Sequence, residues 1–345
     1  MIRSQTARKI FIPKHVFRIS RASRTQVDNV FFVVEQGGTF GYGEASPNSF
    51  FNENASDVEM RLLALSDYLR RQTLVTIEDI QRIWQEIWER VAPSRACQCA
   101  VDLALWDLWG KLNQQSVIEL ALGTYAFDVL TSATLGICPR EEWDQRISDL
   151  KEFKTIKVKM DSTPNLDLLK AIRKQSSATI RVDANGAWSA LDIPKLSGQM
   201  ADLGVEFIEQ PLPPSEDERM TRILLESKLP ILADESCVGL EHIPNLVGRF
   251  SGFNIKLVKC GGITPAMNMI KLGRQLGLKT MVGCMLESSL LISAGTVVAQ
   301  GADFADLDGS WLIQNDPFDG LEYKGGKIKA THGSGLGITL RQSDL

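Results

Sequence analysis

The sequence predicts an α/β fold in which a (β/α)8 barrel follows a smaller N-terminal α+β capping domain. The length of 345 residues exceeds that of a typical single domain. After residue 125, short β-rich runs alternate with amphipathic helical stretches, and eight such runs recur about every 25 residues. Repeated strand–helix units are typical of parallel sheets, and eight even units favour a closed barrel over an open doubly wound sheet.

The predicted capping domain covers residues 1–124. Its first 45 residues are typical of β structure, with an apolar strand over 29–35 and a glycine-containing turn and second strand over 36–44. From 55 to 122 the apolar residues follow helical spacing. This domain should therefore combine a small sheet with several helices.

The remaining chain forms the predicted barrel over residues 125–318 and a last segment over 319–345 that returns to the capping domain. The eight predicted strands lie at residues 129–137, 155–160, 179–184, 205–209, 230–234, 253–258, 279–284 and 303–308. The C-terminal ends of barrel strands converge on one mouth, where barrel enzymes place their active sites. No glycine-rich nucleotide-binding sequence follows the first strand.

Composition argues against several classes of protein. The net charge of −4 disfavours nucleic-acid binding, which needs a basic surface. No stretch reaches the roughly 20 apolar residues that span a bilayer, and the N-terminus lacks the apolar core of a signal peptide. The six cysteines form no CxxC pair, which is typical of reduced thiols in a cytoplasmic protein. The three histidines lie far apart in the sequence, so any metal should have oxygen ligands, as Mg²⁺ prefers.

Three carboxylates end successive predicted strands. Asp183, Glu209 and Asp234 lie at the ends of strands three, four and five, which should bring them into one pocket. Like charges crowded together repel and raise each other's pKa. A divalent cation would remove this repulsion, so the pattern predicts a Mg²⁺ site. The alternative is that each acid only caps the helix after it, but three in succession favour the metal.

Lysines end the second and sixth predicted strands, on opposite sides of the mouth. Lys157 and Lys159 share one strand face because side chains alternate with a period of two, and Lys256 lies across from them. A buried lysine near other cations can act as a base. Two bases facing a planar enolate could remove a proton from one face and return it to the other. The alternative is that the lysines are solvated or only form salt bridges with the acids.

Together these motifs resemble the enolase superfamily, in its muconate-lactonising branch, across the whole chain. The motifs that carry the resemblance are KVK at 157–159, DAN at 183–185, EQP at 209–211, ADES at 233–236 and NIKLVKCGG at 254–262. The resemblance implies one Mg²⁺ per subunit, held by Asp183, Glu209 and Asp234. It also implies that Asn185 and Glu235 support this site from outside.

The resemblance assigns roles to the lysines as well. Lys159 and Lys256 would be the two acid/base catalysts, and Lys157 would lie by the substrate carboxylate and offset its charge. Lys256 fits this role better than Lys259, because the spacing of Lys256 from Asp234 matches the family. Lys259 lies three residues further on and should face the other way.

The sequence DLD at 306–308 resembles the Asp-x-Asp pair of dipeptide epimerases. Asp306 and Asp308 would face the same way and anchor the α-ammonium of a dipeptide. Without them the barrel would fit a muconate cycloisomerase or an o-succinylbenzoate synthase equally well, because those substrates lack the ammonium. Thr134 and Cys284 lie at strand ends where family members contact substrate. Arg24 aligns with an arginine that binds the glutamate side chain in Ala-Glu epimerases. The alternative is that Arg24 is an exposed loop arginine without a role in specificity.

These features predict an isomerase that inverts the C-terminal residue of a small dipeptide, such as L-Ala-D/L-Glu, by 1,1-proton transfer between two lysines. Such a substrate implies murein-peptide metabolism, and the resemblance implies a homo-oligomer. A Schiff-base lyase with Lys159 as nucleophile is a different class that needs no metal, so the three carboxylates argue against it. A non-catalytic binding protein is disfavoured because no essential residue is missing.

Overall fold

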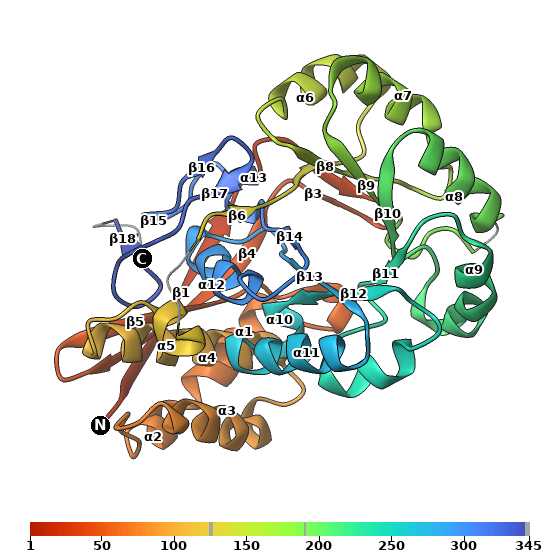
Figure 1. Cartoon of the computed structure of the whole chain (residues 1–345). Helices are drawn as coiled ribbons and strands as arrows, with labels where there is room; N and C mark the ends of the chain where they lie inside the picture. The colour runs from red at the N-terminus through yellow and green to blue at the C-terminus, as the bar shows by residue number, and fades with distance from the viewer. Residues whose placement is uncertain (124–126, 190, 342–345) are drawn as a thin grey trace.

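The computed structural model describes residues 1–123, 127–189 and 191–341. At its centre is a sheet of eight parallel strands, each paired with the next along the chain. The strands are β7 (Ala133–Leu135), β8 (Thr155–Lys159), β9 (Thr179–Asp183), β10 (Val205–Glu209), β11 (Ile231–Ala233), β12 (Gly252–Lys256), β13 (Lys279–Gly283) and β14 (Phe304–Asp306). They surround a common centre with helices outside them (Figure 1), so the predicted barrel is confirmed.

The first and last strands bring the sheet almost to closure. Ser132 N, just before β7, donates a hydrogen bond to Ala305 O on β14 over 3.3 Å. Leu307 N donates to Thr131 Oγ1 over 2.7 Å. The ends of all eight strands therefore face one mouth, which is the geometry that gathers distant residues into one site.

The helices that alternate with the barrel strands pack against the sheet through apolar residues. In α7, Leu168 and Ile172 are buried, and Asn165 caps the N-terminus by accepting from two backbone N–H groups. The helices outside the barrel are α6 (Trp143–Asp149), α7 (Leu166–Gln175), α8 (Ile193–Asp202), α9 (Met220–Glu226), α11 (Ile263–Gln275), α12 (Ser289–Ala299) and α13 (Gly309–Leu312). Three 3-10 helices accompany them: η2 (Arg140–Glu142), η3 (Pro214–Arg219) and η4 (Leu240–Leu246). No helix in the described part of the chain is long and apolar enough to cross a membrane.

Two predicted strands differ from the observed ones. The run over 129–137 divides into β6 (Val129–Leu130) and β7, because β6 pairs antiparallel with β17 (Lys327–Ile328) outside the barrel. The run over 253–258 ends as a strand at Lys256, where α10 (Leu257–Cys260) begins. Each apolar run therefore serves two elements, which hydrophobic periodicity alone does not separate.

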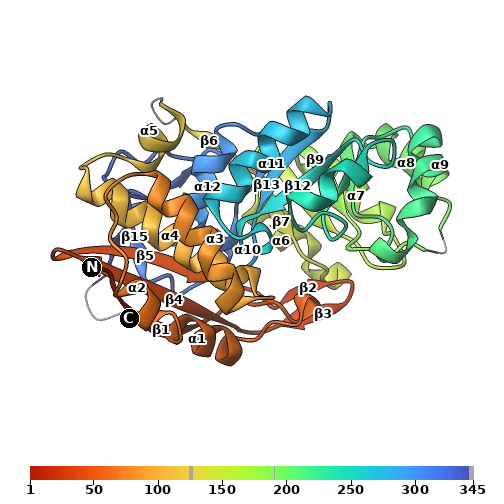
Figure 2. The same cartoon turned by 90° about the horizontal axis from the view of Figure 1, so that it is seen from below.

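The N-terminal domain is the predicted α+β unit. Its antiparallel sheet contains β1 (Arg3–Phe11), β4 (Val27–Gln36) and β5 (Thr39–Ala45), and a hairpin extends from it as β2 (Phe17–Ile19) and β3 (Ala22–Arg24). Its helices are η1 (Ser49–Phe51), α1 (Ala55–Leu63), α2 (Ser66–Leu69), α3 (Glu78–Val91), α4 (Arg95–Leu112) and α5 (Val117–Leu122). Figure 2 shows the hairpin at the end of this sheet that lies next to the barrel.

Helix α4 packs directly on β5 where glycines allow it. A Cβ at Gly43 would lie 1.8 Å from Ala100 O, and one at Gly41 would lie 2.2 Å from Ala104 O. A side chain at either position would therefore push the helix away from the sheet. The glycines noted in the sequence as a turn signal thus also set the spacing of two layers.

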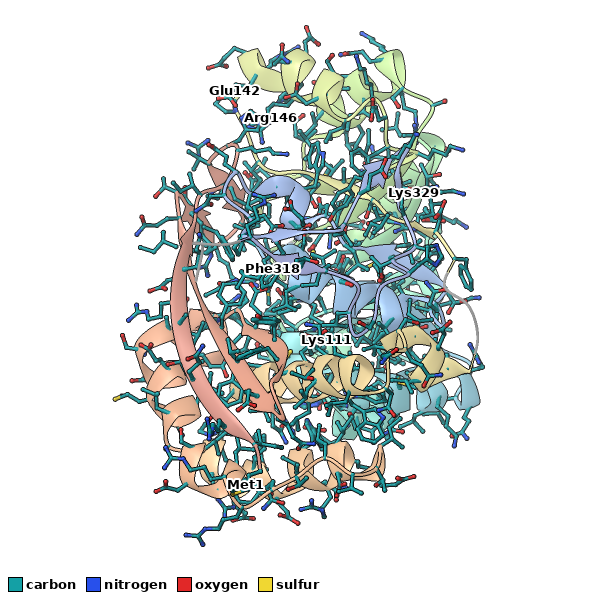
Figure 3. The ribbon with its side chains drawn as sticks, turned by 90° about the vertical axis from the view of Figure 1, so that its left-hand side faces the viewer. Met1, Lys111, Glu142, Arg146, Phe318 and Lys329 are labelled. Atoms are coloured by element: carbon teal, nitrogen blue, oxygen red, sulfur yellow. The ribbon has the colours of Figure 1, made fainter. Side chains whose placement is uncertain are left out.

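The C-terminal segment contacts the capping domain. The ring centroid of Phe318 lies 5.6 Å from that of Phe31 and 6.0 Å from that of Tyr42, and Figure 3 shows Phe318 between the capping sheet and the barrel. Leu336 N donates to Asp107 Oδ1 over 2.9 Å. The short strands of this segment are β15 (Phe318–Asp319), β16 (Tyr323–Lys324), β17 and β18 (Thr339–Leu340). The predicted boundary between residues 124 and 125 lies outside the described residues.

Candidate active site

Three carboxylates meet at the barrel mouth. Asp183 and Glu209 end β9 and β10, and Asp234 directly follows β11. One carboxylate oxygen from each lies within 4.8 Å of the others, and all three residues are buried. Glu209 Oε2 accepts no hydrogen bond from the described residues, which leaves a buried oxygen available as a ligand. A hard divalent cation such as Mg²⁺ fits this donor set.

Lys157 extends from β8 into the middle of these acids. Its Nζ lies 2.7 Å from Glu209 Oε2, 2.7 Å from Asp306 Oδ2 and 3.1 Å from Asp183 Oδ2, although the contact with Glu209 lacks hydrogen-bond geometry. Burial lowers the pKa of Lys157, but the attraction of the surrounding carboxylates outweighs it, so the pKa lies well above its usual value. The ammonium group therefore stays charged and offsets the acids.

The titration of the acids reflects the same crowding. Burial, together with the charges of Asp183 and Asp234, raises the pKa of Glu209 to about 7. Burial also acts on Asp234, but Lys256 and Lys259 outweigh it and hold the pKa of Asp234 well below its usual value. A cation bound beside Glu209 would favour its ionised form and so oppose the effect of burial.

Lys159 and Lys256 approach this cluster from opposite sides. They end β8 and β12, which are four strands apart in the eight-stranded sheet. Lys159 Nζ lies 2.6 Å from Asp183 Oδ2, and Lys256 Nζ lies 2.8 Å from Asp234 Oδ2. Burial lowers the pKa of Lys256, but Asp234 outweighs it and raises that pKa. A planar substrate between the two ammonium groups would have one on each face.

Lys259 does not face away from the site, so that expectation is wrong. Its Nζ donates to Asp234 Oδ1 and Asp234 O, each over 2.6 Å, and to Cys237 O over 3.0 Å. The strand ends at Lys256 and α10 follows, so the two-residue alternation of a strand stops applying before Lys259. Lys256 and Lys259 therefore hold opposite oxygens of the same carboxylate.

Asp306 and Asp308 line the same mouth beside β7. Asp306 Oδ1 accepts from Ser132 Oγ over 2.6 Å, and Asp308 Oδ2 accepts from Thr134 N over 2.6 Å. Cys284 Sγ lies 3.8 Å from Asp308 Oδ1, so the structure brings Thr134 and Cys284 to this acid. Burial and the charge of Asp306 raise the pKa of Asp308 to about 6.

A cavity of about 240 Å³ lies between the barrel mouth and the capping domain. The barrel contributes the lysines and acids described above except Asp183 and Glu209, which do not line the cavity. The capping domain contributes residues of the β2–β3 hairpin and residues 46–51. Arg24 lies on this hairpin and donates to Asn48 Oδ1 over 3.4 Å. Among the described residues no carboxylate forms an ion pair with Arg24, so its guanidinium can bind an anionic group of a ligand.

Sequence reasoning missed Arg21 as part of the site. Arg21 donates to Asn185 O over 2.8 Å and forms a short ion pair with Glu235, so it joins the hairpin to the loops after β9 and β11. The guanidinium also lies over the Phe50 ring, 4.5 Å from its centroid. Nothing in the sequence separates Arg21 from its neighbour Arg24, because the partners of both lie far away along the chain. Asn185 and Glu235 lie together, with Asn185 Nδ2 3.4 Å from Glu235 Oε1.

Gln210 is a second residue that sequence reasoning left without a role. Its Oε1 accepts from Asp234 N over 2.7 Å and from Ser236 N over 3.1 Å. Its backbone has a φ of 36°, a left-handed conformation that is strained for a residue with a side chain. These bonds fix the backbone at Asp234, and the position within EQP, directly after Glu209, was the only signal for it.

The comparisons with known proteins agree with this geometry. Residues 4–123 match the mandelate racemase / muconate lactonizing enzyme N-terminal domain, and residues 140–344 match the enolase C-terminal domain-like family. The L-Ala-D/L-amino acid epimerase of Maribacter sp. is 34% identical over 95% of this chain and 96% of its own length. The L-Ala-D/L-Glu epimerase of Escherichia coli is 34% identical over 92% of this chain and 96% of its own length.

A solved structure extends the likeness to three dimensions. The dipeptide epimerase from Methylococcus capsulatus, complexed with Mg and the dipeptide L-Arg-D-Lys, has a TM-score of 0.88 at 29% identity. The match covers 98% of this chain and 99% of that one. With both of its halves matched and relatives aligned along nearly its full length, the chain belongs to the mandelate racemase/muconate lactonizing enzyme family of the enolase superfamily.

Proposed function

We propose that this protein is a Mg²⁺-dependent dipeptide epimerase that inverts the α-carbon of the C-terminal residue. The observation that carries the proposal is the placement of Lys159 and Lys256 on opposite sides of a carboxylate triad, with Asp306 and Asp308 at one end of the same cavity. The relatives named above as epimerases support the same reaction. The enzyme class is therefore an isomerase acting on amino-acid derivatives.

Each group of residues has a different role in the proposed reaction. Asp183, Glu209 and Asp234 hold the metal, and the bound ion supplies positive charge where the substrate carboxylate becomes more negative. Lys157 adds a fixed positive charge beside that carboxylate. One of Lys159 and Lys256 removes the α-proton, and the other donates a proton to the opposite face of the resulting enolate. The α-carbon is inverted and no other bond changes.

The acid pair favours a dipeptide over other carboxylate substrates. Asp306 already faces Lys157, whereas Asp308 bonds to Thr134 and Cys284 and forms no ion pair with a described residue, so an α-ammonium can pair with it. Cycloisomerase and o-succinylbenzoate synthase substrates lack this ammonium and would leave a buried carboxylate without a cation. Arg24 favours an acidic side chain at the C-terminal residue, so we propose D/L-Glu at that position, as in L-Ala-D/L-Glu.

The test is solvent-deuterium incorporation, measured by mass spectrometry, across a set of L,L- and L,D-dipeptides with Mg²⁺. One deuterium at the C-terminal α-carbon, lost in EDTA and restored by Mg²⁺, is the expected result. If no dipeptide exchanges while the protein binds Mg²⁺, the dipeptide assignment is wrong and the cycloisomerase or synthase activity takes its place. Trapping of a carbonyl substrate on Lys159 by borohydride would instead identify a Schiff-base lyase.

We further propose three units along the chain, with a capping domain over 1–124, the catalytic barrel over 125–318 and a returning segment over 319–345. The hydrogen bond from Leu336 N to Asp107 Oδ1 of the capping domain supports this division. The six cysteines are free thiols, which supports a reducing, cytoplasmic location. A homo-oligomer with one Mg²⁺ per subunit and a role in murein-peptide turnover complete the proposal.

A further inference from the structure

A second cavity of about 180 Å³ adjoins the one at the barrel mouth. It lies between residues 13–15 of the capping domain, α6, and Trp311 on α13. Phe17, Thr134 and Leu312 line both cavities and form the partition between them. None of the lysines and acids assigned to catalysis and metal binding lines the second cavity, so it has no role in the reaction described so far.

The partition is tied to the acid that would hold the α-ammonium. Thr134 N donates to Asp308 Oδ2 over 2.6 Å, and Leu312 O, on the same short helix that follows Asp308, accepts from Lys14 N over 2.7 Å. A ligand whose ammonium group pairs with Asp308 would therefore have its N-terminal α-carbon next to this partition. The side chain on that carbon has the second cavity as its nearest free space.

The charged residues that line the second cavity include two cations, Lys14 and Arg146. Arg146 is the most buried of them, with a side chain 13% exposed. Its nearest carboxylate is Glu142, at 3.7 Å, and it makes no hydrogen bond within the described residues. Figure 3 shows Arg146 and Glu142 side by side at the edge of the molecule. A guanidinium group has five N–H donors, so a nearly buried one with no hydrogen bond is suited to bind an acceptor.

The other polar groups leave the cavity with a positive balance. Lys14 Nζ lies 4.7 Å from the centroid of the Trp311 ring. His15 lies 3.6 Å from Asp149, the one carboxylate among the described residues that line this cavity. An apolar side chain would leave the guanidinium of Arg146 unsatisfied, whereas a carboxylate would pair with it.

We propose that this cavity is a subsite for the side chain of the substrate's N-terminal residue and that it favours a side chain ending in a carboxylate. The inference rests on the proposed dipeptide epimerase activity. It makes Arg146 a specificity residue at the end of the substrate opposite to Arg24, and it identifies acidic dipeptides, in which both side chains carry carboxylates, as the best substrates.

The test compares dipeptides that differ only at the N-terminal residue. The kcat/KM for epimerisation is measured for L-Glu-L-Glu, L-Gln-L-Glu and L-Ala-L-Glu with the wild-type protein, Arg146→Met and Arg146→Lys. We expect the wild type to prefer L-Glu-L-Glu over L-Gln-L-Glu. We expect Arg146→Met to lower the ratio of kcat/KM for L-Glu-L-Glu to that for L-Ala-L-Glu about tenfold, which corresponds to about 1.4 kcal/mol, and Arg146→Lys to lower it less.

Arg140→Met is the matched control. Arg140 lies on the preceding turn, is exposed and stacks on Trp143 outside the second cavity, so its loss should leave this ratio unchanged. Equal kcat/KM for L-Glu-L-Glu and L-Gln-L-Glu in the wild type would overturn the subsite, even if Arg146→Met does not fold. An equal fall for all three substrates in a folded Arg146→Met would overturn it too. Absence of α-proton exchange with every dipeptide would instead overturn the epimerase function itself.

Discussion

At the barrel mouth the lysines lie against carboxylates, whereas on the capping hairpin Arg24 lacks an ionic partner among the described residues. Lys157 contacts three acids, and Lys256 and Lys259 hold the two oxygens of Asp234. The mouth is therefore a rigid, mutually neutralising network that can support a single chemistry. The hairpin presents a cation for the substrate to satisfy. The difference indicates that reaction type is set by strand ends and substrate choice by loops.

The largest effect should follow the loss of either of the two lysines that we propose as acid/base catalysts. We expect Lys159→Met or Lys256→Met to lower kcat for epimerisation by about 10²- to 10⁴-fold, the usual contribution of a positioned acid or base. Each variant should still exchange the α-proton of one enantiomer with solvent deuterium, because the other lysine remains. Lys170→Met, at an exposed lysine on α7, is the control. Full epimerase activity in either variant would refute the two-base mechanism.

A smaller effect should distinguish a lysine that stabilises the barrel mouth from a lysine that acts in the proposed reaction. Lys259→Met removes a buried cation that bonds Asp234 and two further carbonyls, so we expect the free energy of unfolding to fall by about 3 kcal/mol. Lys256→Met, which removes one hydrogen bond to the same acid, should destabilise the protein less while abolishing epimerisation. The free energy of unfolding of both variants is measured by urea denaturation. The reverse order of stabilities would show that Lys259 does not position Asp234.

A substitution in the acid pair should weaken the binding of dipeptides more than the binding of Mg²⁺. Asp308→Asn replaces the proposed anchor of the α-ammonium and should raise KM for dipeptides at least tenfold, because a charge-assisted hydrogen bond becomes a neutral one. The affinity for Mg²⁺, measured by calorimetry, should change less than threefold. Unchanged KM values would remove the main reason for preferring a dipeptide over the substrates of the cycloisomerases.

Arg24 should have a milder effect, confined to one side chain of the substrate. We expect Arg24→Gln to lower kcat/KM for L-Ala-L-Glu by about tenfold while altering L-Ala-L-Gln little, since only the carboxylate uses the guanidinium charge. A parallel assay of both dipeptides measures this. An equal loss for the two would mean that Arg24 shapes the hairpin rather than selecting the substrate.

The smallest expected effect concerns the contact between the two regions. Glu44 on β5 accepts hydrogen bonds from Ser288 and Asn29, and burial raises its pKa to about 7. Because the folded pKa lies above the unfolded value of about 4.5, this group's contribution to stability is complete below pH 4.5 and is lost as pH rises through 7. The melting temperature should fall between about pH 4.5 and pH 7 by about 2 °C or more and level off at higher pH.

The matched variant for this effect is Glu44→Gln, which cannot ionise. In this variant the melting temperature should change less with pH over the same interval. Glu287 and Asp316 also lie near Glu44 and can add a pH dependence of their own. An identical pH dependence in the wild type and the variant would assign the change to those acids.

The same contrast explains how much could be predicted from the sequence. The strand ends could be located to within a few residues because apolar runs stop where polar residues begin. This was sufficient to predict that Asp183, Glu209 and Asp234 lie together, as they do in the structure. Lys259 was misplaced because strand periodicity was carried past the point where α10 begins. The error thus arose at a junction between two elements, where neither period applies.

Arg21 illustrates a second kind of limit. Its partners, Asn185 and Glu235, are separated from it by 164 and 214 residues along the chain. Only the docking of the hairpin on the mouth brings them together, and no local pattern encodes that docking. The subsite around Arg146 was missed for the same reason, because residues 13–15, α6 and α13 come from three distant segments.

The packing of Phe318 against Phe31 also has a consequence for how the protein is made. The two rings are about 290 residues apart in the chain. At 5–20 residues per second, a ribosome needs roughly 15–60 s to synthesise that interval. Throughout this time the nascent capping sheet lacks the aromatic ring that covers part of one face. The domain that emerges first is therefore the one whose packing is completed last.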